Sequence, residues 1–168
     1  HYCGTTYPKI IECPQCGSVN WMEKNFGTEK IEELVETEFA NMKVARMDVD
    51  SVRGKTAHDN LVKQFEQQRI DILIGTQMVV KGLDFDKVSL VGILDADGLL
   101  SFADFRVSER AFQLMEQVSG RAGRKGKQGT VIIQATNVKH PALQLVQQHD
   151  YKQFYTIEIE NRKEFFYP

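Results

Sequence analysis

The amino-acid sequence predicts an α/β fold, a parallel sheet with helices on both faces. Three short apolar runs, at 70–76, 88–97 and 130–136, have the composition of buried parallel strands. The segments before and between them carry apolar residues at helical spacing. Strands that alternate with helices in this way indicate a parallel sheet that is covered on both sides.

The first half of the chain contains two helix–strand repeats. The segment TEKIEELVETEF (28–39) has apolar residues at 31, 34, 35 and 39, which is the spacing of one helix face, and Thr28 is placed to cap it. VARMDVD (44–50) alternates like a strand. Leu61, Val62 and Phe65 give 55–68 helical spacing, and IDILIGT (70–76) ends the half as a buried strand.

The second half repeats the pattern. VSLVGILDAD (88–97) predicts a strand, ERAFQLMEQVSG (109–120) a strong helix, and TVIIQAT (130–136) another buried strand. Helical patterns at about 140–149 and 150–165 close the chain. Functional loops in parallel sheets lie beyond the carboxyl ends of the strands. We therefore expect GTQMVVKG (75–82), DADG (95–98) and the region around Arg121 in or near such loops.

Composition limits the classes of function. The 168 residues are 42% hydrophobic and 26% charged, which is typical of one ordinary globular domain. No apolar run approaches the roughly 20 residues that span a bilayer, so no membrane partner is expected. The formal net charge of −2 provides no general attraction for nucleic acid. Since the first residue is His1 rather than Met, we expect a piece of a longer chain.

Residues 1–24 differ from the rest and hold all of the cysteines, Cys3, Cys13 and Cys16. An odd number of cysteines at one end argues against a disulfide framework and for a cytosolic protein. Because the segment is irregular and rich in Cys, Pro and Gly, we interpret it as the remnant of a metal-binding ribbon. The main domain then covers residues 25–168.

A phosphate-binding loop is missing from the chain. The tripeptide GKT (54–56) would need a glycine at position 49, where Val49 stands, so a solvated turn before the helix is the better interpretation. Asp95 and Asp97 could imitate a Mg²⁺-binding acidic pair, but capping of a strand end or turn is at least as probable. This chain is therefore not expected to hydrolyse ATP alone.

Two stretches point to a known family. GTQMVVKGLDF (75–85) and QVSGRAGR (117–124) resemble, in this order, motifs V and VI of the superfamily 2 helicases, which lie on the second of two RecA-like lobes. The successive segments GTEKIEEL, RMDVD, LDADGLLSFADFR and HDYKQFY are similar to the PriA family of bacterial replication-restart helicases. The resemblance covers nearly the whole chain and implies a RecA-like C-terminal helicase lobe with motifs IV, V and VI.

The resemblance assigns an ATP-facing set. Arg121 and Arg124 match the motif VI arginine fingers, which neutralise the γ-phosphate of ATP bound on the first lobe. The alternative is a solvated loop rich in Arg and Lys. The other residues expected on the nucleotide side are Gly82, Asp84, Gln117 and Gly120. Mg²⁺ and ATP would be held mainly by the first lobe.

The resemblance also assigns DNA contacts and structural residues. Thr76 and Gln77 match residues that meet the phosphates of a single strand without reading its sequence. Gly27 and Thr28 match motif IV, where a helix start suits a DNA phosphate, although a plain N-cap is equally consistent. We interpret the charged residues of ADFRVSER as an ion-pair network on a helix face: Asp104, Arg106, Glu109 and Arg110.

Zinc is implied only through the family. Its cysteine-rich insertion binds two zinc ions through four C-x-x-C pairs. CPQC, with Cys13 and Cys16, matches the last pair, and Cys3 would belong to the other ion. Because a structural zinc site needs four ligands, zinc is expected in the whole protein rather than in this chain alone.

The resemblance implies a function for the whole protein. It would be an ATP-dependent 3′–5′ DNA helicase of the cytoplasm that acts on branched and single-stranded DNA. Its partners would be other primosome proteins and single-strand binding protein. Two alternatives stay open: a lobe of another superfamily 2 helicase, such as a RecG-like one, and a zinc-ribbon nucleic-acid binding module with no motor role.

Overall fold

The computed structural model describes residues 10–20, 27–48, 55–76, 79, 85, 87–123 and 129–168. The elements are α1 (Thr28–Glu38), β1 (Val44–Met47), α2 (Lys55–Glu66), β2 (Ile72–Gly75), β3 (Leu90–Ile93), α3 (Ala96–Leu100), α4 (Val107–Ser119), β4 (Thr130–Ile133), α5 (Pro141–Gln148) and α6 (Tyr151–Glu164). The alternation of helices and strands that the sequence predicted is confirmed, and the short helix α3 is an addition. No helix in the described ranges is long and apolar enough to cross a bilayer.

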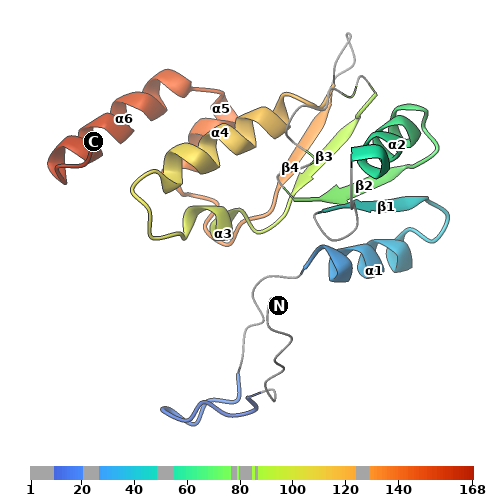
Figure 1. Cartoon of the computed structure of the whole chain (residues 1–168). Helices are drawn as coiled ribbons and strands as arrows, with labels where there is room; N and C mark the ends of the chain where they lie inside the picture. The colour runs from blue at the N-terminus through green and yellow to red at the C-terminus, as the bar shows by residue number, and fades with distance from the viewer. Residues whose placement is uncertain are drawn as a thin grey trace.

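The described strands form two parallel pairs, which agrees with the parallel strands that the sequence predicted. β1 pairs with β2 and β3 pairs with β4, each over four residues. Within the described residues, no hydrogen-bonded ladder joins β2 to β3. Figure 1 shows β2 and β3 as the inner strands of the two pairs. Periodicity could predict the strands but not which of them become neighbours.

The β1–β2 pair is covered on both faces. Met47 is fully buried and packs with Leu61, Val62 and Phe65 of α2. The preceding residue, Arg46, pairs instead with carboxylates of α1. Because successive side chains of a strand point to opposite faces, α1 and α2 lie on opposite sides of this pair (Figure 1).

Among the residues that the structure describes, the β3–β4 pair is covered on one face only. Ile93 and Ile133 pack on the main core, which contains Phe112 and Met115 of α4 together with apolar residues of α3, α5 and α6. Phe112 stacks on Phe154 of α6 with ring centroids 4.2 Å apart. The other face bears three apolar side chains that are more than half exposed, those of Leu90 (56%), Leu94 (52%) and Ile132 (57%). The prediction of helices on both faces is therefore wrong for this pair within the described chain.

Candidate functional site

The segment after α4, which carries the predicted arginine finger, lies at the amino ends of β3 and β4. The N–H of Gly123 donates to the carbonyl of Val88 at 3.0 Å, and the N–H of Thr130 donates to Ser89 at 2.9 Å. The prediction that Arg121 lies near the carboxyl ends is wrong. A crossover helix runs antiparallel to the strands it connects, so its own carboxyl end arrives where the next strand begins.

The end of α4 brings three of the predicted residues together. Gln117 lies in the last turn of α4, Gly120 follows as the C-cap, and Arg121 comes next. The N–H of Gly120 donates to Glu116 at 2.9 Å and that of Arg121 donates to Val118 at 3.0 Å, so the helical turn continues through the arginine backbone. Arg121 is half-buried, whereas Gln117 and Gly120 are exposed. The predicted partners Arg124, Gly82 and Asp84 lie outside the described residues.

Two glycines allow the backbone of the Arg121 segment to lie close to the start of β4. Gly123 has φ +74°, a left-handed conformation that favours glycine. At Gly129 a Cβ atom would lie 2.2 Å from the backbone nitrogen of Gly123 and 2.4 Å from the carbonyl carbon of Ala122. Only a residue without a side chain allows the two backbones to approach this closely. The sequence analysis did not predict that position 129 requires glycine.

Thr76 is exposed and lies directly after the carboxyl end of β2, whereas the Arg121 segment lies at the amino ends of β3 and β4. It follows Gly75, where a Cβ atom would lie 2.5 Å from the carbonyl oxygen of Met47. This crowding explains a glycine immediately before the predicted DNA-contacting threonine. Gln77 lies outside the described residues, so its predicted role remains a prediction.

The start of α1 differs from the expectation. Gly27, in an extended conformation, is the N-cap, and no side chain caps the helix there, so the prediction of Thr28 as N-cap is wrong. Thr28 is the first helical residue, and its hydroxyl donates a short hydrogen bond to the Asp48 carboxylate. Asp48 comes from the end of β1, a long-range partner that local spacing cannot reveal. A DNA phosphate at this helix start would have to approach a carboxylate.

Arg46 ties α1 to β1. Its guanidinium lies 3.0 Å from Asp48 Oδ2, 3.3 Å from Glu29 Oε1 and 3.1 Å from Glu32 Oε2. The side chains of Arg46 and Asp48 are only 17% and 10% exposed. This cluster places the beginning of α1 beside the carboxyl end of β1. Sequence reasoning missed it, because the partners are distant along the chain.

The DADG segment is structural. Asp95 has φ +52° and caps α3, where its carboxylate accepts the N–H of Gly98 at 3.1 Å. Asp97 accepts the N–H groups of Thr136 and Asn137, which follow β4. These hydrogen bonds hold the pKa of Asp97 below its ordinary value. The capping interpretation is confirmed.

Cys13 and Cys16 lie on one tight turn. The N–H of Gly17 donates to the carbonyl of Cys13 at 2.9 Å, and Gly17 has φ +69°. The backbone N–H groups of Cys16 and Gln15, followed by the Cys16 thiol, lower the pKa of the Cys13 thiol. The turn thus favours a thiolate, the form that binds zinc. The described residues contain no group of three candidate metal ligands, and Cys3 lies outside them.

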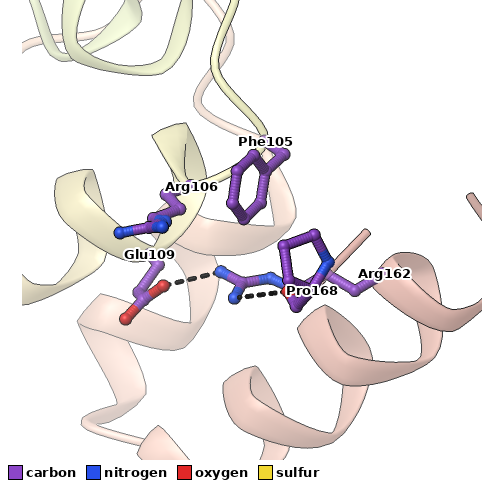
Figure 2. A pocket seen from close by; sticks show the side chains of 5 residues that line it. All are labelled: Phe105, Arg106, Glu109, Arg162 and Pro168. Atoms are coloured by element: carbon purple, nitrogen blue, oxygen red, sulfur yellow. Dashed lines mark hydrogen bonds and ion pairs between the residues drawn. The ribbon is translucent and has the colours of Figure 1, made fainter. Parts of the chain in front are cut away.

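The charged residues of ADFRVSER were predicted to form one ion-pair network, and only some of them pair with one another. Arg110 Nη1 lies 2.6 Å from Asp104 Oδ2. Glu109, however, pairs with Arg162 of α6, whose Nη2 lies 2.6 Å from Glu109 Oε2. This pair lines a hollow of about 260 Å³ together with Phe105, Arg106 and Pro168. Figure 2 shows the five side chains around it. The ion pair occupies the hollow and joins α4 to α6, so we assign it a structural role.

Comparison with known proteins agrees with these motifs. The helicase conserved C-terminal domain family matches residues 18–126. The chain is 46% identical over 168 residues to the replication restart protein PriA of Bacillus subtilis, all of this chain and 21% of that protein. It is 44% identical to that of Synechocystis and 42% identical to that of Treponema pallidum, again over all of this chain and over 20% and 25% of those proteins.

The chain thus spans about a fifth to a quarter of the length of these relatives. The alignments run through both predicted motifs and through the cysteine-bearing start. The chain therefore belongs to the helicase conserved C-terminal domain family, and its resemblance to the PriA family is confirmed along its whole length.

Proposed function

We propose that this chain is the second motor lobe of an ATP-dependent 3′–5′ DNA helicase of replication restart. The observation that carries the proposal is the placement of Arg121, which leaves α4 on a turn that is hydrogen-bonded to the sheet. The match to the helicase C-terminal family and the names of the relatives support the same function. The proposal concerns the longer protein, of which this chain contributes one half of a composite site.

On the nucleotide side, Arg121 and Arg124 would approach the γ-phosphate as it is transferred. A guanidinium there neutralises charge that develops on the equatorial oxygens. The chain has Val49 where a phosphate loop would need its first glycine, so ATP and Mg²⁺ would be held by the other lobe. Gln117 and Gly120, one turn from Arg121, would lie on the same side, with Gly82 and Asp84 contacting the ribose.

On the DNA side, Thr76 and Gln77 would contact phosphates of a single strand. The exposed Thr76 hydroxyl at the end of β2 can donate to a phosphate oxygen, which positions the strand without reading its sequence. Gly27 and Thr28 are the weaker candidates, because the Asp48 carboxylate already engages the Thr28 hydroxyl. Rigid-body closure of two lobes around ATP would alternate the grip on the strand.

The cysteine turn fits one half of a zinc site. Cys13 and Cys16 would donate two thiolates, and a tetrahedral site would need two more from elsewhere in the longer protein. Zinc there would fix the fold of the cysteine-bearing segment rather than take part in hydrolysis. Cys3 would serve the second ion of the same segment.

The replication restart function implies partners for the longer protein. They would be branched and single-stranded DNA, other primosome proteins and single-strand binding protein, in the cytoplasm where the bacterial chromosome lies. The names of the relatives favour this set over that of a RecG-like helicase.

The test is DNA-stimulated ATP hydrolysis by the full-length protein with Arg121→Ala. We expect turnover to fall by roughly 10³-fold or more, the range for a required arginine finger. Affinity for single-stranded DNA should stay close to that of the wild type, because Arg121 lies away from Thr76. Arg69→Ala, at an exposed arginine after α2, is the matched control and should hydrolyse ATP normally. Turnover near the wild-type rate in Arg121→Ala would overturn the assignment.

A further inference from the structure

The first half of α4 is fixed to α6 by two side-chain contacts. At the start of α4, Glu109 Oε2 lies 2.6 Å from Nη2 of Arg162, the ion pair drawn in Figure 2. One turn later, the ring of Phe112 stacks on that of Phe154 with centroids 4.2 Å apart. Because the partner on α6 moves toward its amino end as the chain advances along α4, the two helices run antiparallel.

A third contact of this kind lies near the end of α4. The Glu116 carboxylate lies 3.0 Å (Oε1) and 3.2 Å (Oε2) from Nδ1 of His149, the C-cap of α5. Since an ionised carboxylate can only accept, Nδ1 carries the hydrogen and donates it. Positions 109, 112 and 116 are three and four residues apart, so the three contacts form one row along the surface of α4.

The corner between α5 and α6, formed by His149 and Asp150, has a fixed backbone. His149 has φ +54°, and its N–H donates to the carbonyl of Val146 at 3.1 Å. The N–H of Asp150 donates to Leu145 at 3.0 Å, and the Asp150 carboxylate caps α6. Leu145 and Val146 are buried in the main core. The imidazole of His149 is therefore carried by a backbone that is anchored in the core.

The other partner of this contact lies one turn before the predicted arginine finger. The backbone carbonyl of Glu116 accepts the N–H of Gly120 at 2.9 Å, and Gly120 is the C-cap that precedes Arg121. Continuing the row of contacts by four positions from Glu116 also leads to Gly120. The side chain of Glu116 is thus held by the α5–α6 corner while its backbone holds the turn that leads to Arg121.

The exposure of the pair shows what such a contact can contribute. The side chains of His149 and Glu116 are 67% and 30% exposed, and exposed ion pairs add little to the stability of a fold. A contact of fixed geometry can still set the direction of a helix end. The rate of a reaction is sensitive to direction, because a misplacement of about 1 Å can cost on the order of 10²-fold.

We propose that Glu116 and His149 are positioning residues for the arginine finger, which fix the last turn of α4 against the α5–α6 corner and so set where Arg121 enters the nucleotide site. The inference rests on the function proposed above for Arg121. Both α5 and α6 lie beyond residues 18–126, which the helicase family matches. A part of the chain outside that match thus contributes to the ATP site through α4.

The experiment compares Glu116→Gln and His149→Gly in the full-length protein. Glycine adopts a left-handed conformation without strain, so His149→Gly removes the imidazole and keeps the corner. Each variant should lower kcat of DNA-stimulated ATP hydrolysis by about 3- to 10-fold with little change in KM for ATP, because only the approach of Arg121 is altered. The double variant should lose no more than the larger single loss, since both changes remove one contact.

Amide hydrogen exchange of the peptide that contains Gly120 and Arg121 gives a readout that is independent of turnover. Its exchange should be faster in Glu116→Gln and in His149→Gly than in the wild type. Glu109→Gln is the matched control, because it removes an ion pair of the same kind at the other end of α4. At a temperature at which every variant is folded, its kcat and the exchange of this peptide should equal those of the wild type.

Several outcomes would overturn the positioning role. They are a wild-type kcat or wild-type exchange in either variant of the pair, additive losses in the double variant, and an equal loss of kcat in Glu109→Gln. Arg121→Ala, measured in parallel, separates this failure from that of the proposed function. If Arg121→Ala is inactive while the variants of the pair behave as the wild type, only the positioning role is wrong. If Arg121→Ala hydrolyses ATP normally, the proposed function is wrong and the positioning role with it.

Discussion

Asp97 Oδ1 accepts the backbone N–H of Asn137 at 3.1 Å, a contact that joins two points 40 residues apart. The same carboxylate accepts the N–H of Thr136, so α3, which follows β3, is tied to the loop that follows β4. The pairing holds the carboxyl ends of β3 and β4 together. It also explains why DADG contains two aspartates, since Asp95 separately caps α3.

Asp97→Asn should destabilise the chain in a pH-dependent way. The hydrogen bonds from Thr136, then Asn137, lower the pKa of Asp97 below its ordinary value of 3.8. A carboxyl with a lowered folded-state pKa stabilises the fold above its unfolded-state pKa and loses that effect as pH falls through its folded-state pKa. The Tm difference between wild type and variant should therefore be constant above about pH 5 and shrink below pH 3.8.

The matched control is Glu36→Gln, at an exposed position of α1. It removes one carboxylate without touching the β3–β4 ends, and its Tm should follow the wild type at each pH. A Tm difference for Asp97→Asn that grew on acidification would contradict the assignment.

Arg46→Met should lower the free energy of unfolding by about 2 kcal/mol, because it removes the Arg46 guanidinium from the nearly buried Asp48 carboxylate. Chemical denaturation of the 168-residue chain measures this change. Lys30→Met is the control, since the Lys30–Glu33 pair is exposed and its loss should leave stability nearly unchanged. Equal effects of the two variants would show that Arg46 does not hold α1 on β1.

Phe112→Ala should lower the free energy of unfolding by about 3–5 kcal/mol. Its ring is 1% exposed and stacks on Phe154, so truncation leaves a cavity between α4 and α6. Phe166→Ala, at a ring that is 95% exposed, serves as the control in the same denaturation experiment and should be close to neutral. If Phe112→Ala changed the free energy of unfolding only slightly, Phe112 would not be a central residue of the main core.

Gly129→Ala should displace the Arg121 segment, because a Cβ atom there lies 2.2 Å from the nitrogen of Gly123. Overpacking of this kind costs about 1–3 kcal/mol of stability, and in the full-length protein we expect a fall in ATP turnover as well. Gly92→Ala adds the same methyl group where a Cβ atom meets nothing within 4 Å, so the 168-residue chain should tolerate it. Normal stability and turnover in Gly129→Ala would refute the close approach.

Cys13 should alkylate with a pH midpoint below its ordinary value of 9.0, because the N–H groups of Cys16 and Gln15 stabilise the thiolate. The measurement is the rate of iodoacetamide labelling against pH in Cys16→Ser, which keeps a hydroxyl donor beside Cys13. In denaturant the same variant should return to a midpoint near 9.0. Identical midpoints with and without denaturant would mean that the turn does not activate Cys13.

Features that depend on local periodicity could be predicted from the sequence. The α4 segment shows this, since the apolar spacing that predicted the helix also places Ala111, Phe112 and Met115 on its buried face. The buried strands were likewise predicted from short apolar runs. The type of element needs only neighbours along the chain.

Features that depend on distant partners could not be predicted. Thr28 looked like an N-cap because of its position, but its hydroxyl contacts Asp48, 20 residues away. The Arg121 segment was expected at the wrong strand ends, although a helix that connects two parallel strands runs antiparallel to them and so ends beside the amino end of the next strand. The exposure of Leu90 and Ile132 among the described residues was missed for a similar reason, since an apolar run does not reveal what covers it.

The backbone contacts that fix the Arg121 segment would have a consequence for the proposed motor role. The turn after Ser119, the Gly123–Val88 hydrogen bond and the close approach of Gly129 order the backbone when the chain folds. The entropy of ordering is then lost once, during folding, rather than in each catalytic cycle. In the proposed role as an arginine finger, Arg121 would need only the approach of the opposite lobe to reach its phosphate, and domain motion rather than a search of loop conformations would then set the speed of each cycle.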